Sequence, residues 1–458
     1  MFALLISTYD MGRQPFGLAS PAAWLRRAGW DVACADVAKQ RLDDEAIAAA
    51  DLVGFHLPMH TATRLAGPVI GRVRRLNQSA RVCAYGVYAP LNEEWLRSIG
   101  VDAVFGGEFE EHLIAWAGLK ACATEESPTR AAVAQPSRAA DDRRISRIRF
   151  LVPDRSGLPP LSQYASLQVP DGTRRLAGYT EASRGCKHLC RHCPIVPVYD
   201  GQFRVVRPEV VLADIDAQVA AGAAHITFGD PDFFNGPAHA MRIVAAMHAR
   251  HPALSYDVTI KIEHLLRHRD LLPRLAASGC AFVTSAVESV DDRVLALLRK
   301  GHTRADFIEA VGASRDAGVT LAPTFVAFHP WLSLESYCDL LDTIAALDLV
   351  EQVAPIQLAI RLLVPHGSRL LELPEMRRHL GPFDPATLAY RWSHPDPRVD
   401  ALQEEVTAIV GARLAADRSV VFDTISARAH ECAGLPRVDV RPARARATVP
   451  YLNEPWYC

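Results

Sequence analysis

The sequence predicts an α/β protein with two successive parallel sheets. Two observations support this expectation. Short β-rich apolar runs alternate with stretches of helical apolar spacing across residues 1–118, and the same alternation begins again after residue 150. Consecutive parallel strands need a crossover connection, which is usually a helix. We therefore expect an open, doubly wound sheet first and a partial (β/α)6 barrel second.

The first sheet is expected to have five strands, because five β-rich runs are separated by helical stretches or turns. The strands are expected at residues 2–7, 31–37, 51–57, 80–86 and 102–107, and helices at 20–29, 61–77 and 92–100. Open sheets of this kind bind ligands at the carboxyl ends of their strands. The loops at residues 9–17 and 85–90 would lie at that edge.

Residues 119–150 are expected to be a linker, because Ala, Ser, Pro and charged residues replace the apolar periodicity there. The barrel is expected over residues 151–375 and a helical extension with a cysteine-ending tail over 376–458. The expected barrel strands are 177–183, 225–230, 256–262, 281–289, 320–328 and 355–364, with helices at 207–222 and 291–301 among those between them.

The composition argues against several classes of partner. The chain of 458 residues has 50 Lys+Arg and 52 Asp+Glu, so its net charge of -2 offers no electrostatic basis for binding nucleic acid or an anionic membrane. No apolar run is long enough for a membrane span, and the start MFALLIST lacks the basic lead and cleavage site of a signal peptide. We expect a cytoplasmic protein whose ten cysteines are thiols or metal ligands.

Three of these cysteines cluster in the stretch EASRGCKHLCRHCPIV, at Cys186, Cys190 and Cys193. A structural zinc site normally has four protein ligands. His188 and His192 could complete such a set, so zinc is one alternative, but no second cysteine pair at ligand spacing occurs in the sequence. Three thiolates suit instead a 4Fe-4S cluster that leaves one iron for an external ligand.

At these residues the chain resembles the radical S-adenosylmethionine (SAM) superfamily, in which a Cys-x3-Cys-x2-Cys loop follows the first barrel strand. The resemblance implies a 4Fe-4S cluster on the three cysteines and SAM as the ligand of the fourth iron. It also implies that an electron cleaves a carbon–sulfur bond of SAM, with flavodoxin, ferredoxin or a reductase as donor. His192 lies where the family usually has an aromatic ring near the adenine.

Two further stretches lie where this family contacts SAM. In FGDPDFFNG, after the second strand, Asp230 and Asp232 are candidates to accept from the SAM amino group, although an ordinary Asp-Pro turn is the alternative. In SAVESVDDRVLALLRKGHT, Glu288 is the candidate to hold the ribose hydroxyls, since a bidentate carboxylate orients a diol. Ser289 belongs to the same candidate site, but it could instead cap the following helix.

Polar residues at other strand ends are weaker candidates. Arg361, after the sixth expected strand, could pair with the SAM carboxylate. Lys261 and Glu263, after the third, are candidates for the cofactor site or for a rim ion pair. His329 follows the fifth strand, although lone histidines are more often structural.

The first domain resembles the Rossmann-like cobalamin-binding domain that precedes many radical SAM barrels, and residues 104–113 are similar to the segment that closes it. The resemblance implies cobalamin as a further cofactor. The Asp-x-His-x-x-Gly motif that supplies a lower axial histidine in some cobalamin proteins does not occur, and the first loop reads YDMGRQPFG. A Rossmann-like domain with a purely structural role therefore stays an alternative.

The sequence ends in PYLNEPWYC, which is more apolar than most chain ends. It resembles radical SAM proteins with Cys-Cys-Ala-Glu-Pro tails, in which the second residue can be selenocysteine, and a related group that ends Arg-Cys-Cys-Leu-Lys-Cys. The match stops at Cys458, so the next codon could be a selenocysteine UGA read as stop, or the tail could have been cut. We expect the tail to fold back toward the barrel mouth and Cys458 to take part in catalysis.

The resemblance implies an enzyme, and a transferase is the preferred interpretation. The related tail group includes the arsinothricin-pathway enzyme, which implies transfer of the 3-amino-3-carboxypropyl group of SAM to trivalent arsenic, a soft acceptor suited to thiols or a selenol. The alternatives are hydrogen abstraction by a 5′-deoxyadenosyl radical, cobalamin-dependent methyl transfer to an organic substrate, and a non-catalytic metal- or cobalamin-binding regulator.

Overall fold

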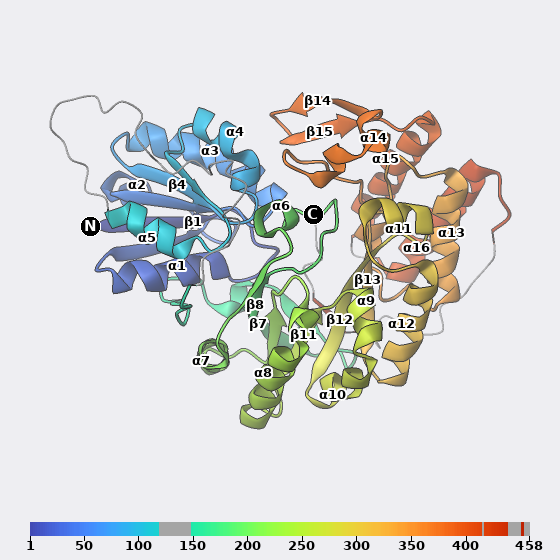
Figure 1. Cartoon of the computed structure of the whole chain (residues 1–458), viewed down its shortest axis with the longest axis horizontal. Helices are drawn as coiled ribbons and strands as arrows, with labels where there is room; N and C mark the ends of the chain where they lie inside the picture. The colour runs from blue at the N-terminus through green and yellow to red at the C-terminus, as the bar shows by residue number, and fades with distance from the viewer. Residues whose placement is uncertain (119–147, 415, 438–449, 453–458) are drawn as a thin grey trace.

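The computed structural model describes residues 1–118, 148–414, 416–437 and 450–452 (Figure 1). The expected α/β fold is confirmed: an open parallel sheet precedes a second, curled sheet that forms a half barrel. Among the helices of the described ranges, none has the length and apolar character needed to cross a membrane.

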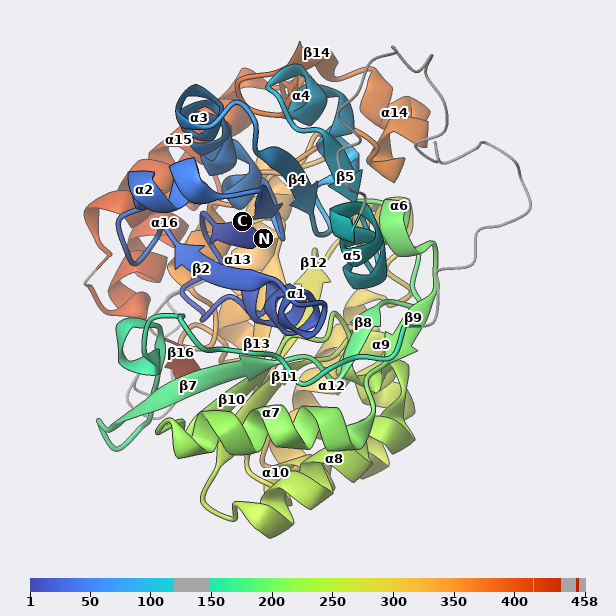
Figure 2. The ribbon, with the colours of Figure 1, turned by 90° about the vertical axis from the view of Figure 1, so that its left-hand side faces the viewer.

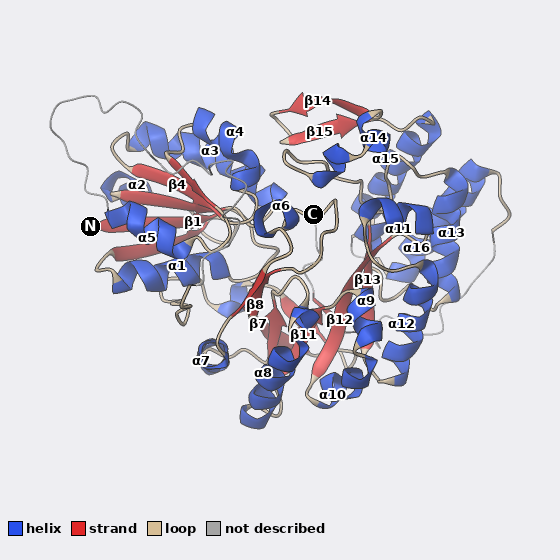
Figure 3. Cartoon of the chain, viewed as in Figure 1, coloured by secondary structure: helices blue, strands red, loops and turns tan. Residues whose placement is uncertain are grey.

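The first sheet has five parallel strands in the order β2-β1-β3-β4-β5. They are β1 (Phe2–Ser7), β2 (Asp31–Asp36), β3 (Leu52–His56), β4 (Arg81–Tyr85) and β5 (Ala103–Phe105). Helices cover both faces (Figure 3), with α1 (Phe16–Arg27) and α5 (Glu110–Gly118) on one face and α2 (Asp44–Ala49), α3 (His60–Leu76) and α4 (Glu93–Ser98) on the other. The five expected strands are confirmed, whereas α2 and α5 were not expected.

Helix α1 begins at Phe16, before the expected start at residue 20, and it continues through Pro21. Proline has no backbone N–H, so it leaves a carbonyl of the preceding turn without a partner. The hydroxyl of Tyr85 donates to the carbonyl of Gly17 in this turn, at 2.9 Å. A Cβ at Gly17 would lie 2.1 Å from the ring of His56, so the helix approaches the sheet closely because this residue is glycine. Contacts with strands remote in sequence therefore stabilise the first turns of the helix.

The second sheet has the order β13-β12-β11-β10-β7-β6-β16. Its parallel strands are β7 (Arg174–Thr180), β10 (His225–Phe228), β11 (Ser255–Thr259), β12 (Cys280–Glu288) and β13 (Thr320–Phe325). Two short strands, β6 (Ser166–Gln168) and β16 (Tyr451–Leu452), extend the β7 edge by antiparallel pairing and were not expected. The barrel helices are α7 (Pro208–Ala220), α8 (Pro237–Arg250), α9 (Ile262–Arg267), α10 (Leu272–Ala277), α11 (Asp292–Leu298), α12 (Arg304–Asp316) and α13 (Leu334–Ala346).

The expectation of a sixth barrel strand at residues 355–364 is wrong. Pro355–Leu358 form a short 3-10 helix, η5, and within the described chain this region pairs with the sheet through a single bridge between Phe328 and Arg361. The side chain of Gln357 gives the physical reason. Its Oε1 accepts from the backbone N–H of Phe325 at 3.1 Å, so a side chain takes the hydrogen bond that a sixth strand would have made.

The C-terminal region adds a hairpin and two long helices. The hairpin of β14 (Leu380–Asp384) and β15 (Ala389–Trp392) was not expected. Helix α16 (Arg418–Ala433) packs against α13 and α15 (Pro397–Ala412), and apolar residues of both late helices belong to the hydrophobic core of the barrel. The expected helical extension is therefore present and shares the core of the barrel.

The carboxyl edge of the first sheet faces the barrel (Figures 1 and 2). Gln14 follows β1, and its Oε1 accepts from the guanidinium of Arg155 at 2.9 Å. Glu108 follows β5, and its Oε1 accepts from the hydroxyl of Tyr199 in the barrel at 3.3 Å. The carboxyl edge of the first sheet therefore lies close to the barrel.

Candidate active site at the barrel mouth

The three clustered cysteines lie in the loop between two short antiparallel strands, β8 (Ser183–Gly185) and β9 (Phe203–Val205). The backbone N–H of Cys186 donates to the carbonyl of Gln202 at 3.0 Å and closes the base of the loop. Gly185 has a φ of +76°, and a Cβ there would lie 2.5 Å from the Gln202 carbonyl oxygen. The turn into the first cysteine therefore requires glycine.

The thiols of Cys186, Cys190 and Cys193 are free. Burial raises the pKa of Cys186 to about 11 and that of Cys193 to about 12. Such thiols are neutral without a metal, so they must release protons when they bind one. Three free thiols in one closed loop suit an iron–sulfur cluster with one open iron better than a four-ligand zinc site.

Glu288, the last residue of β12, lies beside the cysteine loop. Its Oε1 is 3.0 Å from His192 Nε2 and 3.3 Å from Lys300 Nζ. Burial alone would raise the pKa of Glu288, but Lys300 and His192 outweigh burial and hold the pKa at about 2. Glu288 also has a left-handed φ of +71°, which costs a non-glycine residue about 1–3 kcal/mol. The mouth therefore contains a charged carboxylate in a defined orientation.

Lys300 and His302, between α11 and α12, were missed at the sequence level. Lys300 is buried; although burial opposes its charge, Glu288 keeps its pKa above the ordinary value. Both ring nitrogens of His302 are buried and have no hydrogen-bond partner within the described chain. The available signal was the run Lys-Gly-His after a helix, but that run does not show which carboxylate lies beside it.

Ser289 does not cap the helix that follows it. The N-cap of α11 is Asp291, whose carboxylate accepts from the N–H groups of Arg293 and Val294. The hydroxyl of Ser289 accepts from the N–H of Asp291 at 3.1 Å. The capping alternative is therefore wrong, and the place of Ser289 in the cofactor site stays a prediction.

Asp230 supports the strand that leads to the cysteine loop. Its carboxylate accepts from the N–H of Ala182 at 2.9 Å and from the hydroxyl of Ser183 at 2.5 Å. Burial raises the pKa of Asp230 to about 7. Both oxygens are already engaged, so a contact with the SAM amino group, which stays a prediction, would have to displace one of these bonds.

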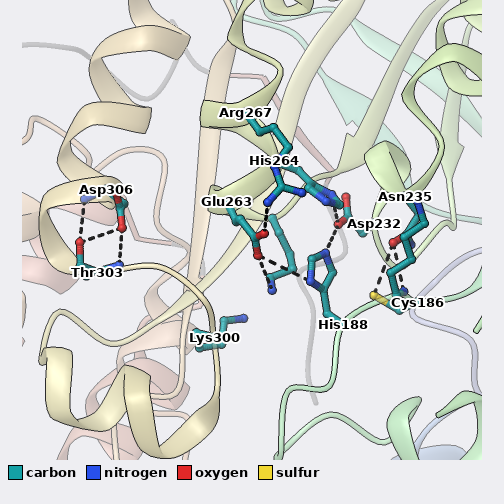
Figure 4. Close-up of polar contacts among 12 residues, drawn as sticks. Cys186, His188, Asp232, Asn235, Glu263, His264, Arg267, Lys300, Thr303 and Asp306 are labelled. Atoms are coloured by element: carbon teal, nitrogen blue, oxygen red, sulfur yellow. Dashed lines mark hydrogen bonds and ion pairs between the residues drawn. The ribbon is translucent and has the colours of Figure 1, made fainter. Parts of the chain in front are cut away.

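Asp232 belongs to a second polar group, which Figure 4 shows beside the cysteine loop. Its Oδ2 lies 3.1 Å from His188 Nε2 and 2.7 Å from His264 Nδ1. Burial would raise the pKa of Asp232, but the two histidines outweigh burial and hold it at about 2. We call His188, Asp232 and His264 the two-histidine cluster. His264 was not a candidate from the sequence.

Lys261 and Glu263 lie next to this cluster. Lys261 is buried, and its Nζ is 3.7 Å from Glu263 Oε2. Glu263 Oε2 also lies 3.7 Å from His188 Nδ1, and Glu263 Oε1 lies 2.6 Å from Arg267. The rim ion pair that the sequence allowed is therefore present, and a contact between Lys261 and SAM stays a prediction.

The side chain of Arg361 is held by residues of the C-terminal region. Its guanidinium donates to Asp400 at 2.7 Å and to the carbonyl of Trp392 at 2.6 Å, and it lies over the Trp392 ring. Pairing with the SAM carboxylate, still a prediction, would have to break this arrangement.

His329 is buried, and burial lowers its pKa to about 3, so it is a neutral side chain.

Arg184, two residues before the first cluster cysteine, joins the barrel to the first domain. Its guanidinium lies 2.7 Å from Glu110 Oε1, 3.5 Å from Glu108 Oε2 and 2.7 Å from Glu181 Oε2. Glu108 and Glu110 are buried, and Glu181 is partly buried. Glu108 and Glu110 fall in the segment that the sequence associated with closure of the first domain, so this segment holds the strand from which the cysteine loop begins.

The tail is described only at Pro450–Leu452. Cys458, the candidate catalytic thiol, lies outside the described residues. Tyr451 and Leu452 form β16 against β6, at the edge of the barrel sheet.

Comparison with known proteins identifies the barrel. Residues 180–347 match the family model of the radical SAM superfamily. The chain contains a radical SAM domain. The matched segment includes the three clustered cysteines, Glu288 and Lys300. The match agrees with the expectation of a 4Fe-4S cluster and SAM as cofactors.

Two solved structures are similar over most of the chain. One is the cobalamin-dependent SAM radical enzyme OxsB with aqua-cobalamin and SAM bound, at 14% identity and a TM-score of 0.70, covering 94% of this chain and 71% of OxsB. The other is the radical SAM methyltransferase TsrM from Kitasatospora setae with tryptophan and a SAM analogue bound, at 17% identity and a TM-score of 0.63, covering 89% of this chain and 88% of TsrM. The likeness shows the shared fold of a Rossmann-like domain and a half barrel.

A curated relative is the tRNA-2-methylthio-N(6)-dimethylallyladenosine synthase of Moorella thermoacetica, 26% identical over 193 residues. The match covers 39% of this chain and 43% of that synthase, so it spans less than half of either protein. None of these comparisons tests the tail resemblance or its link to arsenic, which stay predictions.

Proposed function

We propose that this chain is a radical SAM enzyme that holds a 4Fe-4S cluster on Cys186, Cys190 and Cys193. The observation that carries the proposal is the closed loop of three free thiols beside a buried, charged Glu288. When bound, the cluster supplies the electron that breaks a carbon–sulfur bond of SAM. That electron comes from an external donor of the flavodoxin, ferredoxin or reductase type.

Glu288 is the residue that we assign to the SAM ribose. Its carboxylate is charged and oriented, so it can accept from both hydroxyls of a diol. Lys300 balances its charge, and His192 offers a ring beside it for the adenine. These three side chains come from three separate segments that meet only in the folded chain. Lys261 and Ser289 are further candidates to contact SAM.

We propose cobalamin as a ligand of the first sheet. Ser7 and His56 are register partners at the carboxyl ends of β1 and β3. The Ser7 hydroxyl and His56 Nδ1 are buried without a hydrogen-bond partner in the described chain, and such atoms normally have one. A polar ligand at this edge would provide the missing partners. Cobalamin, which is bound in structures of OxsB and TsrM, is the ligand that we propose for this edge, and it would supply methyl transfer chemistry.

Transfer of the 3-amino-3-carboxypropyl group to trivalent arsenic is a second candidate. It rests on the tail resemblance and needs Cys458 to reach the barrel mouth, which the direction of β16 allows. β16 runs antiparallel to β6, and β6 runs antiparallel to β7, so β16 points the same way as β7. Leu452 is level with Arg175, and β7 continues from there to Thr180 at the mouth, about 17 Å further on. The six residues after Leu452 span at most about 20 Å, enough to reach the mouth.

One product experiment separates these functions. Reconstituted, reduced enzyme is incubated with SAM, with and without arsenite and with and without cobalamin. The usual cleavage yields 5′-deoxyadenosine, aminocarboxypropyl transfer yields 5′-methylthioadenosine, and methyl transfer yields S-adenosylhomocysteine. Cobalamin retained after gel filtration would support the ligand proposed for the first sheet. Cluster-loaded enzyme that forms none of the three products would contradict the proposed function.

A further inference from the structure

The two-histidine cluster brings together side chains from three separate segments (Figure 4). His188 lies in the cysteine loop, Asp232 lies directly before η3 (Phe233–Asn235), and His264 lies in α9. One nitrogen or oxygen atom of each residue lies within 4.8 Å of the corresponding atoms of the other two. Asp232 and His264 are buried, and His188 is partly buried. The cluster is thus a compact group of two imidazoles and one carboxylate inside the protein.

The contact between His264 and Asp232 combines a short separation with poor hydrogen-bond geometry. His264 Nδ1 is 2.7 Å from Asp232 Oδ2, yet this buried nitrogen has no partner with hydrogen-bond geometry in the described chain. A ring N–H that donated to the carboxylate would point toward the oxygen. The two atoms are close although the ring N–H does not point at the oxygen, and two ligand atoms that share one ion are close in the same way. Ligand atoms around a metal with bonds of about 2.0–2.2 Å are roughly 3–3.5 Å apart. The separation of 3.1 Å between His188 and Asp232 falls in this range, and that of 2.7 Å between His264 and Asp232 would lengthen by a few tenths of an ångström when an ion binds.

The surrounding contacts orient two of the three side chains. Asp232 Oδ1 accepts from the N–H of Phe234 at 3.1 Å, which directs Oδ2 to the histidines. His188 Nε2 faces Asp232, while its Nδ1 lies 3.7 Å from Glu263 Oε2. Histidine ligands of metals commonly have a carboxylate near the other ring nitrogen, and ligating carboxylates are commonly hydrogen-bonded. The arrangement therefore includes the supporting contacts that metal sites use.

We propose that His188, Asp232 and His264 bind one divalent transition-metal ion, separate from the cysteine-bound cluster. Two imidazole nitrogens and one carboxylate oxygen are the donor set of Fe(II) and Zn(II) centres that keep positions open for water or substrate. Ca²⁺ and Mg²⁺ prefer oxygen ligands and fit this set less well. The carboxylate of Asp232 then serves the ion rather than the SAM amino group.

Metal counting on the cluster-loaded protein tests this site. The reconstituted protein is freed of loose metal with a chelator and dialysed anaerobically against Zn(II) and, separately, Fe(II). Bound metal is compared with acid-labile sulfide, which reports the cluster. His264→Ala removes one proposed ligand. His268→Ala is the matched control, because His268 is the next imidazole along this segment, with its ring 5.8 Å from that of His264, and it is not in the ligand set.

The wild-type protein and His268→Ala should each retain about one ion beyond the cluster, with zinc bound by nitrogen and oxygen at about 2.0–2.2 Å in X-ray absorption. Loss of a supporting contact alone lowers metal affinity roughly 10- to 100-fold, so His264→Ala should lower it by at least that factor at unchanged sulfide content. The proposal is overturned if the wild-type protein retains no extra ion or if His264→Ala retains as much as wild type. Sulfur neighbours at about 2.3 Å would also overturn it, because they would place the zinc on the cysteines.

Discussion

Two polar sites border the cysteine loop, and each contains a buried carboxylate between a loop histidine and a second basic residue. At one site His192 and Lys300 flank Glu288. At the other, His188 and His264 flank Asp232. In both, burial opposes the charge of the carboxylate and the basic partners outweigh it, holding its pKa at about 2. The sites differ in the second base, which is lysine at the first and histidine at the second.

This difference separates two kinds of chemistry. A lysine held by a carboxylate keeps its proton and has no lone pair for a metal, so the Glu288 site is an ion pair that can receive hydroxyl donors. An imidazole can release its proton to an incoming metal and offer a lone pair, so the site of Asp232 can bind a metal ion. The second basic residue, rather than the buried carboxylate, therefore sets what such a site can bind.

The largest loss of activity is expected from a substitution in the cysteine loop, which both sites share. Cys186→Ala should lose most of its iron and all SAM cleavage, because two thiolates are too few to hold the cluster. Iron, sulfide and the absorption near roughly 400 nm measure the loss. Cys432→Ala, at a half-buried cysteine of α16, is the control and should keep all three signals. A triple variant of the loop cysteines that retained them would refute the assignment.

Lys300→Met should lower the free energy of unfolding through its effect on the Glu288 site. It leaves Glu288 with only His192 as a basic partner in a buried position, and loss of one member of a buried ion pair typically costs about 3–5 kcal/mol. The measurement is the free energy of unfolding in denaturant under anaerobic conditions. Adding Glu288→Gln should recover much of the loss, and equal stability of Lys300→Met and wild type would contradict the role of this pair.

Glu288→Gln should weaken SAM binding and leave the cluster in place. Removal of a charged hydrogen-bonding partner costs about 1.5–3 kcal/mol, which is roughly 10- to 150-fold in affinity. The SAM dissociation constant and the sulfide content together test this expectation. Glu309→Gln, at an exposed surface ion pair with Arg269, is the matched control and should bind SAM as wild type does. An unchanged dissociation constant for Glu288→Gln would remove Glu288 from the ribose site.

The smallest effect is expected at the tail. Cys458→Ser should slow turnover of the true acceptor while cluster content and background SAM cleavage stay unchanged, because the thiol would hold the acceptor rather than the cofactor. Initial rates with arsenite and with organic acceptors measure this effect. Equal turnover by Cys458→Ser and wild type would show that this thiol takes no part.

The first sheet was predictable because its signals are local. Each strand is a short apolar run bounded by turn residues, so the five strands of residues 2–107 could be placed from sequence alone. Helix α1 was placed too late, because continuation through Pro21 depends on the hydroxyl of Tyr85. The sixth barrel strand was expected in error for a similar reason, since the N–H of Phe325 is bound by the side chain of Gln357.

Part of the candidate site was also present in the sequence. The spacing of Cys186, Cys190 and Cys193 indicates soft-metal binding before any fold is known, because ligand number and spacing within one loop are local properties. The position of Glu288 at a strand end follows from the alternation of strands and helices. The family resemblance added the cofactors, and the domain match agrees with it.

By itself, the sequence determined the alternation of strands and helices, the three-thiol loop and the placement of polar residues after strands. Only the tertiary structure decided which of those polar residues meet. Lys300 reaches Glu288 across a helix, and His264 reaches Asp232 from the neighbouring strand–helix unit. Such pairings depend on the curvature of the sheet and on how each helix packs against it. These are sums of many weak contacts between distant segments, so the local sequence around each partner does not encode them.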